Sequence, residues 1–128
     1  MALSANGRNA AVDGLATAAK FVSLHTANPG ETGDSEATGG SPAYARKSAT
    51  WGAAVSGVRS LSSAVTFDVP AGSSIAYFGI WSAISGGTFY GAETLRDTDN
   101  QPVVETFGGQ GTYTLTVASL AINNAAAS

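Results

Sequence analysis

The hydrophobic and polar positions near the start of the chain follow the period of an α-helix. The apolar residues that fall at i, i+3, i+4 and i+7, and so form one stripe, are Val12, Leu15, Ala16 and Ala19. Ser4 and Asn6 can each cap the start of such a helix, so the pattern predicts a helix over about residues 4–19. Because the stripe is mostly alanine, this helix would be marginal in isolation. We expect it to dock on the sheet of its own chain or on a neighbouring subunit.

After the helix, apolar and polar residues alternate with the period of a β-strand. Seven segments carry this pattern: residues 21–26, 44–51, 64–69, 74–82, 88–95, 103–107 and 112–122. Both faces are apolar in residues 74–82, which is typical of a central strand covered on both sides. In residues 112–122 the apolar positions change parity, which predicts a bulge near Ala118 and Ser119.

Glycine and proline separate these segments. Residues 27–42 form a long acidic loop that opens with Asn28-Pro29-Gly30, and Ser85-Gly86-Gly87 predicts a hairpin turn. Short strands between such turns indicate a mainly β protein: a β-sandwich of about seven short antiparallel strands with one N-terminal α-helix. We expect a single domain over residues 1–128, with the sandwich at about residues 20–122. Residues 123–128 should fray or pack on a neighbour.

The composition narrows the range of functions that the protein can have. Ala, Gly, Ser and Thr make up more than half of the 128 residues, so the core must be thin. Only 12% of residues are charged and the net charge is −3, which argues against nucleic acid as a partner. The chain has no cysteine for a disulfide or a thiolate and no apolar run of membrane-spanning length, and its first residues lead us to expect no secretory signal. This composition favours a building block that gains stability from neighbours in an assembly.

His25 is the one histidine, and catalysis would require a nucleophile and an orienting carboxylate beside it. The order His25, Asp68, serine is present, but no Gly-x-Ser-x-Gly motif accompanies it. Among so many serines, such an order arises by chance. We therefore predict no catalytic residue, and a strand-end imidazole hydrogen-bonded to the backbone.

Two loops resemble ligand-binding motifs at first sight. Residues 97–101 look like the opening of a calcium loop, but Pro102 and Gly108 occupy the positions where an EF-hand needs Gly and Glu. A polar hairpin turn is the expectation there, with a looser calcium site as the alternative. Residues 108–111 lack the Gly-Lys-Ser/Thr of a phosphate loop, and their glycines predict a hairpin turn that needs backbone freedom. No metal or cofactor is expected.

Aromatic side chains could stack a sugar or line a subunit interface, and the candidates are Trp51, Tyr77, Phe78, Trp81, Phe89 and Tyr90. A thin core needs most of them, so we predict that only Trp51 and Tyr90 face outward. Together with apolar helix residues, they give a candidate interface that consists of Leu3, Val12, Leu15, Trp51 and Tyr90.

Three stretches of the chain carry a family resemblance. The first is Met1-Ala-Leu-Ser, followed after the helix by Val22-Ser-Leu-His-Thr-Ala-Asn-Pro-Gly-Glu-Thr-Gly33. The second is Gly39-Gly-Ser-Pro-Ala-Tyr-Ala-Arg46 with Thr50-Trp-Gly-Ala-Ala54, and the third is Val65-Thr-Phe-Asp-Val-Pro-Ala-Gly72 with Phe78-Gly-Ile-Trp81 and Gly86-Gly-Thr-Phe-Tyr-Gly91. Together they resemble a family of small bacteriophage virion proteins, labelled tail fibre or minor tail proteins in phages of actinobacteria. Residues 41–43 look like an insertion relative to that family.

The resemblance implies a structural protein of the phage particle without catalysis, made in the host cytoplasm. We expect a minor tail or tail fibre protein that assembles with itself, as a trimer, and with other virion proteins. The alternatives are a capsid decoration protein and a module that binds host glycans. The chain has no coiled-coil or collagen-like repeat, so it predicts a compact knob rather than a fibre shaft.

Overall fold

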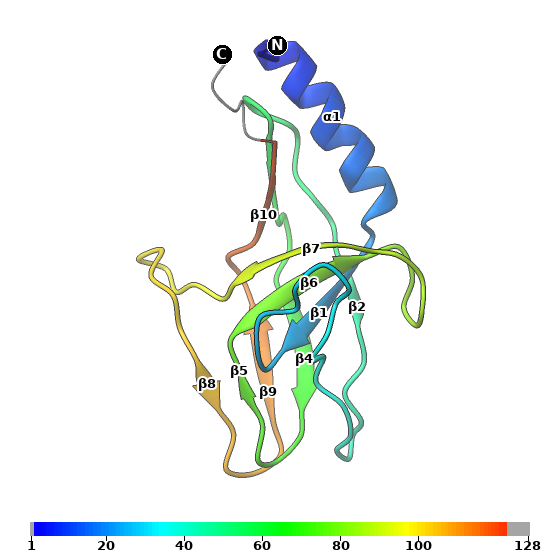
Figure 1. Cartoon of the computed structure of the whole chain (residues 1–128). Coiled ribbons are helices and arrows are strands. Elements are labelled where there is room, and N and C mark those ends of the chain that lie inside the picture. Colours follow the sequence, from blue (N-terminus) through cyan, green and yellow to red (C-terminus); the bar gives the residue numbers. More distant parts are fainter. Residues whose placement is uncertain (1, 123–128) are drawn as a thin grey trace.

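A computed structural model of the chain describes residues 2–122, and the predicted tail, residues 123–128, lies outside them (Figure 1). Within this part, one helix precedes ten short strands. The elements are α1 (Ala5–Ala18), β1 (Phe21–His25), β2 (Lys47–Ser48), β3 (Val58–Ser60), β4 (Val65–Val69), β5 (Ser74–Ile75), β6 (Tyr77–Trp81), β7 (Phe89–Thr94), β8 (Glu105–Thr106), β9 (Gly111–Leu115) and β10 (Ser119–Ala121). The expectation of a mainly β protein with one N-terminal helix is confirmed.

Helix α1 begins where the sequence predicts it. The hydroxyl of Ser4 accepts a hydrogen bond from the Gly7 N–H at 3.1 Å and caps the first turn. Val12 and Ala16 are buried, and the helix packs against β3 and β10. The sequence predicts that the apolar stripe docks either on the sheet of its own chain or on a neighbouring subunit, and in the structure it packs against strands of its own chain. No helix in residues 2–122 is long and apolar enough to cross a membrane.

Four antiparallel strands form the main sheet, in the order β2-β1-β6-β7. Strand β6 lies between two neighbours, and four of its five residues are buried, so the prediction of a central strand is confirmed. The register pairs Val22 with Ile80 and Leu24 with Phe78, so these side chains share one face. Ser23, Gly79 and the other alternate residues lie on the opposite face.

The remaining strands pair in three ladders, β3–β10, β4–β9 and β5–β8, which corrects two predictions. The predicted strand over 74–82 is two strands, because at Ala76 the chain leaves the β5–β8 ladder and enters the main sheet. The parity change in 112–122 is also such a passage, from β9 to β10, and not a bulge.

Other segments differ from the prediction in extent. The predicted strand over 44–51 shortens to Lys47–Ser48, and β3 was not predicted because its apolar run is brief and follows the turn at Ser56 and Gly57. The glycine-rich turn after β8 does not close a hairpin, since β8 and β9 pair with different strands. It lies against the turn after β4, where the Gly72 N–H donates to the Phe107 carbonyl at 2.7 Å.

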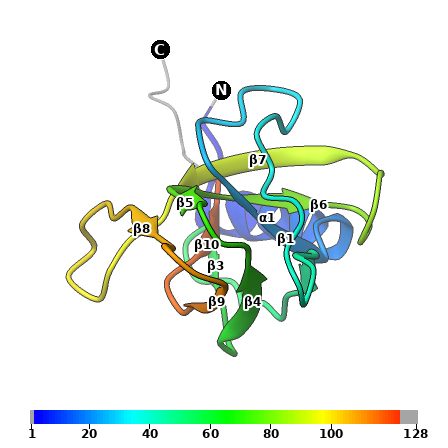
Figure 2. The ribbon, with the colours of Figure 1, turned by 90° about the horizontal axis from the view of Figure 1, so that it is seen from below.

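The core collects side chains from α1, the main sheet and the ladders, an arrangement that is consistent with the predicted sandwich. Its largest fully buried members include Phe67, Leu24, Ile75, Leu95 and Leu115. Figure 2 shows β4 and β9 on one side of the main sheet and the loop that follows β1, in blue to cyan, on the other. The core thus covers one face of the main sheet, and the acidic loop covers the other face.

Candidate functional site

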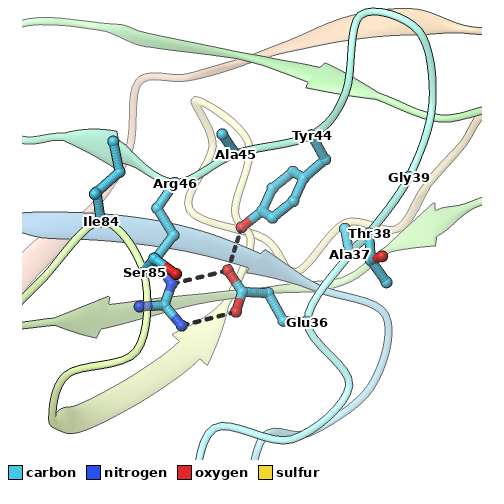
Figure 3. A pocket seen from close by; sticks show the side chains of 9 residues that line it. All are labelled: Glu36, Ala37, Thr38, Gly39, Tyr44, Ala45, Arg46, Ile84 and Ser85. Carbon is cyan, nitrogen blue, oxygen red and sulfur yellow. Dashed lines mark hydrogen bonds and ion pairs between the residues drawn. The ribbon is translucent and has the colours of Figure 1, made fainter.

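Glu36 and Arg46 form a bidentate ion pair between the acidic loop and the segment that enters β2 (Figure 3). The Arg46 Nε and Nη2 atoms each lie 3.0 Å from a Glu36 carboxylate oxygen. Arg46 is buried, which is rare for an arginine unless it is paired and hydrogen-bonded. The planar fork of guanidinium hydrogens matches a carboxylate, so the pair fixes the path of the loop.

The same guanidinium also holds the hairpin between β6 and β7. Its Nη1 donates to the carbonyls of Ala83 and Gly86, at 3.0 and 2.7 Å, and its Cζ lies 3.6 Å from the centre of a Trp81 ring. A stacked, desolvated guanidinium adds cation–π attraction to these hydrogen bonds. Arg46 therefore ties together the acidic loop, the β2 segment and the β6–β7 hairpin.

Tyr44 completes this network. Its hydroxyl donates to Glu36 Oε2 at 2.8 Å and accepts from the Leu24 N–H at 2.9 Å. Burial raises the pKa of Tyr44 well above its ordinary value, so the hydroxyl keeps its proton at physiological pH. The phenol hydroxyl thus connects the acidic loop to β1 through these two hydrogen bonds.

A shallow hollow of about 390 Å³ opens beside the ion pair. Its walls are Glu36, Ala37, Thr38, Gly39, Tyr44, Ala45, Arg46, Ile84 and Ser85 (Figure 3). The two charged side chains in its wall are paired with each other, and the other side chains of the wall carry hydroxyls and apolar carbons.

A second series of hydrogen bonds lies buried under the acidic loop. The Trp81 Nε1–H donates to Ser23 Oγ at 2.8 Å, Ser23 Oγ lies 2.6 Å from His25 Nε2, and His25 Nδ1 lies 2.7 Å from the Asp34 carbonyl oxygen. A carbonyl only accepts, so Nδ1 carries the proton, and Nε2 must accept from the Ser23 hydroxyl. Burial lowers the pKa of His25 and favours this neutral form.

The Ser23–His25 pair has the spacing of a nucleophile and its base, but both residues are fully buried. A Cβ on Gly79 would lie only 2.7 Å from Ser23 Oγ, so the opposing strand closes over the pair. Asp68 lies on β4, opposite Thr112, and is not the partner of the imidazole. The prediction of an imidazole hydrogen-bonded to the backbone is confirmed. Sequence reasoning missed Ser23, although positions two apart on a strand share a face.

The predicted interface residues are dispersed. Val12 and Trp51 are core residues, and Leu15 is half-buried against the core. The prediction that Trp51 faces outward is wrong: it is 7% exposed, and its indole N–H donates to the Ala19 carbonyl at 3.0 Å. Tyr90 is exposed as predicted, on β7 at the edge of the main sheet.

Leu3 lies at the start of α1, and the turn that Arg8 joins to this end carries two exposed valines that the sequence did not single out. Arg8 donates to the Leu3 carbonyl and to the Ser56 carbonyl, at 2.8 and 3.5 Å, and so joins the start of α1 to the turn before β3. Val55 and Val58 flank that turn, and both are exposed. We call Leu3, Val55 and Val58 the apolar tip. The pattern Val-Ser-Gly-Val, two apolar residues around a turn, could have indicated it.

The turn at residues 97–101 has the predicted form. Asp97 Oδ1 accepts from the backbone N–H groups of Asp99 and Gln101, at 2.9 and 3.0 Å, so the carboxylate stabilises its own turn. Within residues 2–122, no three side chains of the metal-binding types gather in one place.

The described residues thus form two hydrogen-bonded networks that hold the acidic loop, and they leave an apolar tip exposed on a small β fold. The class of the protein comes from the sequence comparison. Residues 5–106 match the family of the podophage GP4 fiber I protein gp80. The match spans most of the chain, which therefore belongs to this family of phage fibre proteins, and the resemblance to a phage tail fibre family is confirmed. A search among curated proteins finds no match.

Proposed function

We propose that this chain is a structural subunit of a phage tail fibre, and that it acts without catalysis by assembling with copies of itself and with neighbouring virion proteins. The observation that carries the proposal is the family match over residues 5–106. A closed cyclic oligomer, with a trimer as the expected form, would bring the same apolar surface of each copy together around its symmetry axis.

The apolar tip supports assembly through this end of the molecule. Val55 is 69% exposed, and Leu3 and Val58 are also exposed. Single exposed apolar side chains are ordinary on a protein surface, whereas a patch of them is typical of a contact site, and these three lie on segments that Arg8 joins. The low charge of the chain removes much of the repulsion that would oppose such packing.

A pair of matched substitutions tests assembly through the tip. Val55 and Val104 have similar exposed fractions, 69% and 65%, but only Val55 belongs to the tip. We expect wild-type chain to sediment as an oligomer at micromolar concentration, and Val55→Asp to weaken association at least about tenfold, because a carboxylate would be desolvated at the contact. Val104→Asp should leave association unchanged. A monomeric wild type, or equal behaviour of the two variants, would contradict assembly through the tip.

A further inference from the structure

The segment between β1 and Glu36 folds over the outer face of the main sheet, where it is hydrogen-bonded to His25 and its Pro29 is fully buried. We call residues 27–35 the flap. Its stem is closed by hydrogen bonds from the Thr26 N–H to the Ser35 carbonyl and from the Ala37 N–H to the Leu24 carbonyl, each 2.9 Å long. Its far part rests on aromatic rings, since a Cβ on Gly33 would lie 2.5 Å from the Trp81 ring.

His25 connects the flap to the sheet through both ring nitrogens. Nδ1–H donates to the Asp34 carbonyl in the flap, and Nε2 accepts from Ser23 on the same strand. Ser23 in turn accepts from the Trp81 indole. Each donor in this series of hydrogen bonds has one acceptor, and the series is consistent only with a neutral imidazole.

A second proton on His25 would break this pattern. Nε2 would become a donor facing the Ser23 hydroxyl, whose hydrogen would then lack its acceptor. The new positive charge would be buried near Arg46, which disfavours it, and near Glu36, which favours it but is already paired with Arg46. Phe89, the aromatic residue whose ring contacts the imidazole, offers no compensating charge.

We propose that the flap is an acid-released cover: protonation of His25 detaches residues 27–35 from the sheet and uncovers the aromatic face of Trp81 and Phe89. The closed state is favoured wherever His25 is neutral. Because the pKa of His25 is lower in the closed state than its ordinary value of 6.5, closure is fully stable above pH 6.5 and weakens as the pH falls below that value. This inference does not depend on the fibre assignment.

Hydrogen exchange on the full chain tests the flap directly. After correction for intrinsic exchange, we expect amide protection in residues 27–35 to fall about tenfold for each pH unit below 6.5, until His25 is protonated in the closed state as well. Comparison of pH 7.5 with pH 5.0 spans the ordinary pKa of a histidine side chain. The same comparison in β4 and β9 should show little change.

His25→Gln is the matched variant, because a glutamine amide can accept from Ser23 and donate to the Asp34 carbonyl but does not titrate. Its flap should stay protected at both pH values. Acid-independent protection in the wild type, or equal acid release in His25→Gln, would overturn the proposal. If the variant does not fold, NMR titration of the wild-type imidazole decides the question. The midpoint of His25 protonation must coincide with opening of the flap, and protonation of His25 without opening would refute the proposal.

Discussion

Replacing Arg46 with methionine should lower the free energy of unfolding by about 3 kcal/mol, since removal of one partner from a buried ion pair leaves the other charge uncompensated. Methionine keeps much of the apolar stem but removes every hydrogen bond of the guanidinium. Glu36 would lose both of its bonds to Arg46, and the carbonyls of Ala83 and Gly86 would lose their donor. The stacking on Trp81 would disappear as well. Urea unfolding followed by circular dichroism measures the change.

The control for this prediction is Arg96→Met. Arg96 pairs with Glu93 at 3.3 Å on an exposed surface, where an ion pair contributes at most about 1 kcal/mol. Arg46→Lys should remain well below wild type, because an ammonium group cannot reproduce the bidentate and stacked geometry. Equal losses in Arg46→Met and Arg96→Met would show that the buried network does not stabilise the fold.

Trp51→Ala should cost about 3–5 kcal/mol of unfolding free energy, the range expected when a large aromatic side chain is removed from a core. Trp51 packs in the main core, and its indole N–H donates to the carbonyl of Ala19, the residue that follows α1. Tyr90→Ala removes an aromatic ring that is 42% exposed, and it should cost much less. Both variants are compared by urea unfolding at two protein concentrations.

The two concentrations separate a core role from an interface role. If Trp51 supports the fold of each subunit, its loss is the same at both concentrations. A loss that appears only at the concentration where the wild type is oligomeric would instead identify Trp51 as an interface residue, in agreement with the sequence interpretation and against the structure.

The elements with clear periodicity could be predicted from the sequence. The helix after Ser4, strand β1, strand β4 and the central position of β6 all follow from regular apolar spacing. The breaks at Ala76 and between β9 and β10 could not be predicted, because apolar alternation shows that a strand is half-buried but not which strand it pairs with. The pairing depends on contacts between distant segments.

The candidate site could be predicted from the sequence only in part. The run Tyr44-Ala-Arg46 belongs to the motifs that carry the resemblance, but its partner Glu36 lies in a loop whose path is set by the ion pair itself. Trp51 was misplaced for a similar reason. Its N–H finds an acceptor at Ala19, which is 32 positions away in the sequence, so nothing in its neighbourhood indicated burial.

The most direct test of the fibre assignment is immunogold labelling of purified particles of the phage that encodes this chain. Antibodies against the folded chain should place gold on the tail fibres, as the family membership over residues 5–106 predicts. Antibody adsorbed with the purified chain is the control and should give no gold. Labelling over the capsid would identify a decoration protein instead, and particles without gold would contradict a structural role in the virion.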